Sequence, residues 1–129
     1  MASRLFFLRL ISVVGLLVVS PVACGDGTEA DILGIGAECS SSSDCMEGQS
    51  CLSFKGGYCG VQGCDVDTDC AETSRCVTHD DGQDYCFRVC QDKSECNANR
   101  SVDLESNCSA SVTFVEEGAG KKACVPPSG

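Results

Sequence analysis

Apolar residues are concentrated at the start of this chain and are sparse in the rest. Residues 10–19 are apolar apart from Ser12 and Gly15. After Cys24, large apolar side chains occur in short stretches that alternate with polar residues. Alternation with a period of two predicts strands, and no apolar period of 3.6 residues predicts a long helix. We therefore expect short strands and little helix.

Three pairs of these stretches flank turns that contain glycine, which is the usual signal of a β-hairpin. The turns lie at residues 55–57, around Asp81 and Gly82, and at residues 116–120. Each pair predicts one hairpin. The flanking segments are residues 52–54 with 58–59, residues 76–78 with 85–87, and residues 112–115 with 122–125.

The cysteines follow the same repeat. The sequence holds 13 cysteines, and the last twelve fall into three sets of four. Five residues fill each of the first two gaps in the first two sets, and the third set keeps the first of these gaps. An acid precedes the second cysteine of each set, at Asp44, Asp69 and Glu95. The cysteines expected in disulfides are Cys39, Cys45, Cys51, Cys59, Cys64, Cys70, Cys76, Cys86, Cys90, Cys96, Cys108 and Cys124.

Cysteine at this density in a short exported chain is typical of a disulfide scaffold. Large side chains are too few to offset the conformational entropy of folding by burial alone. We therefore predict a small disulfide-rich fold of tandem short β-hairpin repeats with a minimal hydrophobic core. Repeat 1 covers residues 37–63, repeat 2 covers residues 64–89, and a degenerate repeat 3 covers residues 90–129.

Within each repeat we expect the first cysteine to bond to the third and the second to the fourth. This crossed pattern ties the polar loop between the first two cysteines to both strands of a hairpin. It would make each repeat self-contained, so that losing one would spare the others. Bonds between first and second cysteines also remain open. The expected pairs are Cys39–Cys51, Cys45–Cys59, Cys64–Cys76, Cys70–Cys86, Cys90–Cys108 and Cys96–Cys124.

Residues 1–23 have the pattern of a signal peptide. Arg4 and Arg9 provide a basic start, and the apolar stretch that follows is shorter than the roughly 20 residues that a membrane span needs. A retained N-terminal membrane anchor is the alternative.

Residues 20–25, Ser-Pro-Val-Ala-Cys-Gly, resemble a bacterial lipobox, which implies a lipid on Cys24 and a mature chain that begins there. Pro21 departs from the aliphatic residue that the motif prefers. The odd number of cysteines supports lipidation, because twelve then remain for pairing. Cys24 could otherwise be removed with the signal or stay free. Gly25, by resemblance to the sorting rule of such lipoproteins, implies the outer membrane.

Residues 24–36 would then be the lipidated cysteine and a flexible tether. As an alternative, Ile32, Leu33 and Ile35 would pack on repeat 1.

Residues 38–51, followed by Gly57, Tyr58 and Cys59, resemble the N-terminal cysteine-rich domain of Dickkopf proteins. Residues 64–86 are similar but lack the glycine before the third cysteine. Tandem units behind a lipobox also resemble cysteine-rich lipoproteins of myxobacteria and their relatives. The resemblance implies a fold and does not carry receptor binding over to this chain.

Charge restricts the partners. Removing a leader that carries Arg4 and Arg9 leaves seven basic against 19 acidic residues, so the mature net charge is −12. Nucleic-acid recognition needs basic patches, so we expect no nucleic-acid partner.

The sequence offers little for metal or cofactor chemistry, and we expect neither. Structural zinc sites use closely spaced Cys-x2–4-Cys hooks, whereas five residues is the dominant gap here. Alternating carboxylates at residues 65–69 suggest calcium, but Cys70 and Cys76 occupy positions where an EF-hand loop needs Gly and Glu.

His79 is the only histidine, and it lies in an acidic predicted turn at residues 79–84. We expect an exposed polar turn there and no catalysis. The sequence thus favours a non-enzymatic module at the cell envelope, attached by the lipid on Cys24, that binds an unknown extracellular protein or glycan or has a structural role. The alternative is a secreted protease inhibitor that uses a basic loop at residues 55–57 or 120–122.

Overall fold

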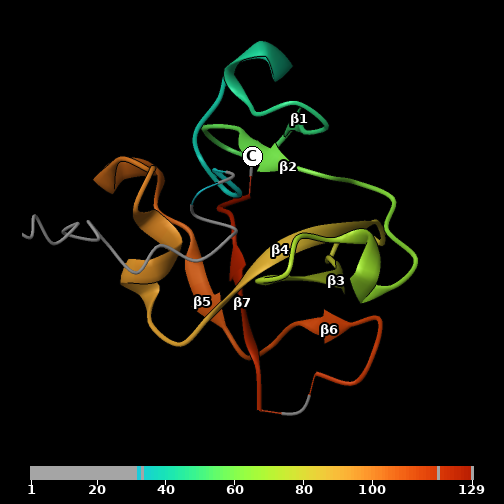
Figure 1. The fold of residues 1–129 in the computed structure, drawn as a ribbon. Helices are drawn as coiled ribbons and strands as arrows, with labels where there is room; N and C mark the ends of the chain where they lie inside the picture. The colour runs from blue at the N-terminus through green and yellow to red at the C-terminus, as the bar shows by residue number, and fades with distance from the viewer. Residues whose placement is uncertain (1–31, 33, 119, 129) are drawn as a thin grey trace, which may run out of the picture.

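The computed structural model describes residue 32, residues 34–118 and residues 120–128 (Figure 1). Its regular structure consists of short strands and short 3-10 turns, held by six disulfides. The small, disulfide-rich, mostly β fold is therefore confirmed. The elements are η1 (Ser42–Asp44), β1 (Ser50–Leu52), β2 (Tyr58–Gly60), η2 (Asp67–Asp69), β3 (Ser74–Thr78), β4 (Asp84–Cys90), η3 (Lys93–Asn97), η4 (Val102–Leu104), β5 (Asn107–Ser109), β6 (Thr113–Phe114) and β7 (Lys122–Val125).

The first two predicted hairpins are present. Strands β1 and β2 pair antiparallel, with Leu52 opposite Tyr58. Strands β3 and β4 pair in the same way, with Thr78 opposite Asp84. The turn between β3 and β4 contains Gly82 at φ 79°, a left-handed conformation that glycine adopts without the steric cost other residues have. Alternation and glycine turns therefore predicted both hairpins correctly.

The third predicted hairpin, between residues 112–115 and 122–125, is wrong. Strand β7 lies between β4 and β5, so both of its hydrogen-bonding edges are occupied. Strand β6 instead pairs with β3, where Phe114 faces Val77 (Figure 1). The long connection from β6 to β7 allows this arrangement, because it does not force the two strands to be neighbours.

A five-stranded antiparallel sheet joins repeats 2 and 3 in the order β5-β7-β4-β3-β6. The chain that leaves repeat 1 adds a bridge between Gln62 and Tyr85 of β4. The two-stranded sheet of β1 and β2 therefore adjoins the larger sheet (Figure 1).

All three repeats contribute to one hydrophobic core. Tyr58 of repeat 1 and Phe87 of repeat 2 are fully buried, and their ring centroids lie 5.3 Å apart. Our expectation that each repeat would be self-contained is therefore wrong for packing, although no disulfide crosses between repeats. Each repeat has too few large side chains to form a core alone. The buried members are Ile35, Leu52, Tyr58, Val77, Tyr85, Phe87 and Ala123.

The folded part begins earlier than residue 37. Ile35, which we placed in the tether, is only 8% exposed and belongs to the core. The backbone N–H of Gly36 donates to the carbonyl of Cys59 at 2.8 Å. Ile32 is exposed, and Leu33 lies outside the described residues. The alternative of packing on repeat 1 therefore holds for Ile35, because the next residue, Gly36, is hydrogen-bonded to β2.

Candidate functional site

The disulfides are the dominant chemical feature of the molecule, and their pairs are the six that the spacing led us to expect. In each repeat one bond joins the start of the polar loop to the third cysteine, and a second joins the end of that loop to the fourth. The bonds are Cys39–Cys51, Cys45–Cys59, Cys64–Cys76, Cys70–Cys86, Cys90–Cys108 and Cys96–Cys124.

The strand register shows how repeat 3 is related to the other two. Cys51 lies directly opposite Cys59, and Cys76 lies directly opposite Cys86. In repeat 3 the same relation holds between Cys108 on β5 and Cys124 on β7. The hairpin of repeat 3 is therefore formed by β5 and β7, with β6 inserted in its connection.

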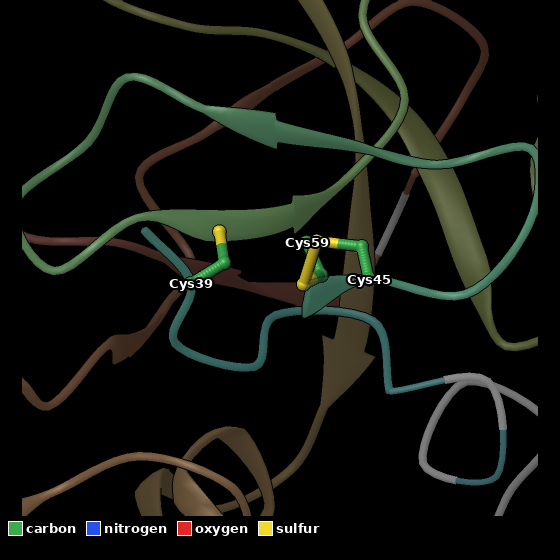
Figure 2. Close-up of side chains that lie close together, drawn as sticks. All are labelled: Cys39, Cys45 and Cys59. Carbon is green, nitrogen blue, oxygen red and sulfur yellow. A yellow bond between two sulfur atoms is a disulfide. The ribbon is translucent and has the colours of Figure 1, made fainter. Parts of the chain in front are cut away.

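The two bonds of each repeat lie close together. Figure 2 shows Cys39 beside the bond between Cys45 and Cys59, and the sulfur atoms of these three residues lie within 4.8 Å of one another. The second and third repeats have the same arrangement. A metal would require thiolates, and every sulfur in these clusters is bonded to another sulfur. In this oxidised state the clusters are cross-links and not zinc sites.

The acid before the second cysteine has the same role in each repeat. One carboxylate oxygen of Asp44 accepts the backbone N–H groups of Ser40 and Ser41, at 2.8 and 3.1 Å. These two hydrogen bonds lower the pKa of the Asp44 carboxyl, as the equivalent bonds do for Asp69. Glu95 accepts two backbone N–H groups at the same positions of repeat 3. The repeated acid therefore closes the polar loop on itself.

A second acceptor joins the polar loop to the first strand of the hairpin in repeats 1 and 2. The Ser42 hydroxyl accepts the N–H of Cys51 at 3.1 Å, and the Asp67 carboxylate accepts the N–H of Cys76 at 3.0 Å. The corresponding residue of repeat 3 is Lys93, which cannot accept a hydrogen bond and forms an ion pair with Glu105. Repeat 3 therefore differs from the others at this position.

Two of the three carboxylates that suggested calcium, those of Asp67 and Asp69, have partners within the protein. Asp67 accepts the Cys76 N–H and lies 3.5 Å from the Arg75 guanidinium. Asp69 accepts two N–H groups of its own loop. These interactions use oxygens of Asp67 and Asp69 that a cation would need, and they give both side chains a structural role.

The turn at residues 79–84 differs from the exposed polar turn that we expected. His79 is half-buried, and its ring meets those of Phe54 and Phe87 edge-on, with centroids 5.3 and 5.8 Å away. Asp81 remains exposed and accepts the Tyr85 hydroxyl at 2.7 Å. His79 packs here because it follows β3 directly and its ring reaches over the end of the shared core.

The two basic loops that suggested protease inhibition are not equivalent. A protease engages the residue at its cleavage site in an extended conformation with the carbonyl accessible. The Lys55 carbonyl accepts a hydrogen bond from Arg100, and the next residue, Gly56, has φ 78°. Lys121 is exposed beside the turn at Gly120. The geometry therefore disfavours the loop at Lys55 and leaves the loop at Lys121 accessible.

Sequence reasoning missed Arg100, which joins repeat 3 to repeat 1. Its Nη1 donates to the carbonyls of Gly36 and Gly57 at 2.9 and 2.8 Å, and its Nη2 donates to that of Lys55 at 3.0 Å. Its Nε donates to the Leu104 carbonyl within its own repeat. Burial lowers the pKa of the guanidinium, which still stays charged at neutral pH. No motif marks this residue, and its only sequence signal is the scarcity of basic residues.

A second contact supports the same junction. The hydroxyl of Ser101 donates to the Glu38 carboxylate at 2.7 Å, and the Ser101 backbone N–H donates to the same oxygen. These bonds, with the nearby Arg100 charge, lower the pKa of the Glu38 carboxyl. Repeats 1 and 3 are thus joined by hydrogen bonds to charged groups, which are stronger than neutral ones.

The remaining predicted site, Cys24, lies outside the described residues. Within the described ranges, no helix has the length and apolar character to cross a bilayer. Comparison of the chain with family models, curated proteins and solved structures found no match.

Proposed function

We propose that this chain is a non-enzymatic, cysteine-rich binding or structural module attached to the cell envelope. The observation that carries the proposal is the pair of crossed disulfides in each repeat. They fix three exposed polar loops to one framework before any partner arrives. Fixed loops lose less conformational entropy on binding, so more of the contact energy becomes affinity.

The use of the polar side chains supports a module rather than an enzyme. Asp44, Asp69 and Glu95 close their own loops, and His79 packs on aromatic rings. Catalytic acids and bases instead keep their proton-transferring atoms available to the substrate. An extracellular protein or glycan is the partner that we propose. The mature charge of −12 argues against nucleic acid.

Attachment through a lipid on Cys24 is part of the proposal and rests on the sequence of residues 20–25. A flexible linker of the length of residues 25–34 would have a mean reach of about 18 Å. The core residue Ile35 would then hold the module close to the membrane surface, which we propose to be the outer membrane. A secreted form is the alternative destination.

A likeness to Dickkopf N-terminal units and to myxobacterial lipoproteins is also part of the proposal. It rests on the cysteine spacing and on the segment Gly57, Tyr58 and Cys59. Glycine is required at position 57, because a Cβ there would lie 2.1 Å from the Cys39 carbonyl oxygen.

Two measurements test the proposal. Labelling with a palmitate analogue should appear in the wild-type chain and vanish in Cys24→Ser. The oxidised protein, immobilised and exposed to envelope extract of the source cells, should retain a partner that a reduced and alkylated sample does not. Persistent labelling of Cys24→Ser would refute the anchor, and equal retention by both samples would refute recognition by fixed loops.

Inhibition of a trypsin-like protease is the alternative, and the accessibility of Lys121 is the observation that favours it. Under this alternative, the oxidised protein would inhibit trypsin and Lys121→Ala would not. Lys55→Ala is the matched control and should behave like the wild type. The binding-module proposal predicts no inhibition by any of the three.

A further inference from the structure

Two adjoining hollows form a trough between the polar loops of repeats 2 and 3. One, of about 500 Å³, adjoins η2 and the start of β3. The other, of about 250 Å³, adjoins the end of β4 and η3. The two share Glu72, Arg75 and Lys121 in their linings. We call this feature the Lys121 trough, and its size suits a few residues of an extended peptide.

Basic side chains are concentrated there. Only seven basic residues follow the leader, and Arg75, Arg88 and Lys121 line the trough. The acids of the trough are already engaged. Asp67 accepts the Cys76 N–H and pairs with Arg75.

Three further charged groups of the lining are engaged as well. Glu95 accepts the backbone N–H groups of Gln91 and Asp92. Glu72 and Arg88 also have partners in the protein. The carboxylates of Asp67 and Glu95 are thus held by backbone N–H groups of their own repeats.

The lining is formally neutral, with three acids and three bases, so what it offers a ligand is unused hydrogen-bond donors. Within the described residues, the Lys121 ammonium forms no hydrogen bond or ion pair. Arg75 uses Nε toward Asp67 and Nη1 toward the carbonyls of Glu72 and Ser74. Its Nη2 has no partner in the part of the chain that the structure describes. Two donors on an otherwise acidic protein favour one carboxylate over a polyanion, which the net charge of −12 would repel.

We propose that the Lys121 trough binds a single carboxylate carried by an extended peptide segment of the partner, with Lys121 and Arg75 as its donors. This inference rests on the proposed binding function and specifies the chemistry of its partner. The charge pair is exposed, so its share of the affinity is modest and falls with added salt.

The test uses the full chain, exported and oxidised, with 15N labelling. The probes are two acetylated tripeptides of the same sequence, Gly-Gly-Ala, one with a free C-terminal carboxylate and one with a C-terminal amide. The free acid should shift the amide signals of Thr73, Arg75, Gln91 and Lys121, with a dissociation constant of about 1 mM. Lys121→Met should weaken this binding by about 3- to 5-fold. Lys55→Met, which removes an exposed lysine outside the trough, should not change it.

Equal shifts with the acid and the amide, or no effect of Lys121→Met, would overturn the inference. Well-dispersed spectra of both variants would exclude unfolding as the cause of a loss. If the oxidised protein still captures an envelope partner while the tripeptide acid produces no shifts, this inference fails and the proposed function stands.

Discussion

Repeats 1 and 3 share one disulfide plan but differ in the connection that it holds. Seven residues join Cys51 to Cys59, whereas 15 residues join Cys108 to Cys124. Both pairs nevertheless lie directly opposite each other across two antiparallel strands. The constant part of the unit is therefore the pair of crossed disulfides, together with the polar loop that the acid before the second cysteine closes. The hairpin connection varies in length, as surface loops usually do.

The longer connection of repeat 3 also stabilises its neighbour. Its strand β6 pairs with β3 of repeat 2, and Phe114 packs against the shared core. Repeat 1 has no such insertion and is held by its own tight turn and by Arg100. The comparison shows two ways of joining small units into one core, an inserted strand and a side-chain clamp.

The largest loss of stability is expected from a substitution in the tight turn of repeat 1. Gly57→Ala should lower the free energy of unfolding by about 4 kcal/mol, because φ is 71° and the new Cβ would lie 2.1 Å from the Cys39 carbonyl oxygen. Gly120→Ala, in the insertion of repeat 3, is the matched control. Its φ is 75°, but no described atom would lie within 4 Å of the added Cβ, so the cost should be about 1 kcal/mol.

Urea unfolding of the oxidised proteins, followed by circular dichroism, measures both values. Similar losses for the two variants would show that the contact with Cys39 is not what restricts Gly57.

Deleting equivalent disulfides tests whether the repeats behave as one unit. The double variants Cys39→Ser/Cys51→Ser and Cys90→Ser/Cys108→Ser remove loops with separations of 12 and 18 residues. Each should lower the free energy of unfolding by about 3 kcal/mol. Because the core is shared, either deletion should reduce amide-exchange protection in all three repeats. If protection were lost only in the altered repeat, the repeats would be self-contained, as the sequence led us to expect.

The sequence predicted the local parts of the fold. Alternating residues around Gly57 and Gly82 specified two hairpins, because turn chemistry and strand periodicity act over only a few residues. It did not predict that β6 would pair with β3. That choice depends on which strand edge is free after β4 and β5 have taken both sides of β7. A single sequence does not reveal such competition between distant segments.

For the candidate sites, too, the sequence predicted contacts within a repeat but not contacts between repeats. The spacing of the cysteines was sufficient to propose all six bonds, since each lies within one repeat. Arg100 could not be found this way, because its acceptors are backbone carbonyls of Gly36, Lys55 and Gly57, and a carbonyl leaves no mark in the sequence. The burial of His79 depends on Phe54, a residue of a different repeat.

Weakening the Arg100 clamp, which joins repeat 3 to repeat 1, should have a smaller effect on stability. Arg100→Lys keeps the charge but lacks the planar fork that reaches the carbonyls of Gly36, Lys55 and Gly57. The free energy of unfolding should therefore fall by about 2 kcal/mol. Arg75→Lys is the control, since Arg75 bonds within its own repeat, and it should cost under about 1 kcal/mol. Urea unfolding measures the loss, and amide exchange at Cys59 locates it. A larger loss for Arg75→Lys would contradict the role of the clamp.

The smallest effect on stability is expected for the polar loops that Asp44 and Asp69 close by hydrogen bonds. Backbone N–H groups lower the pKa of Asp44 and Asp69 in the folded protein. A carboxyl with a lowered folded pKa stabilises the fold above its unfolded pKa of about 3.9, and this contribution is lost as the pH falls through the folded value. Asp44→Asn and Asp69→Asn should therefore lower the melting temperature at neutral pH and reduce its decline on acidification. Asp80→Asn, which removes one exposed acid from the turn after β3, is the control. Calorimetry from pH 7 downward measures the melting temperature of each variant. If the melting temperature fell equally with pH in all three variants, the repeated acid would not stabilise its loop.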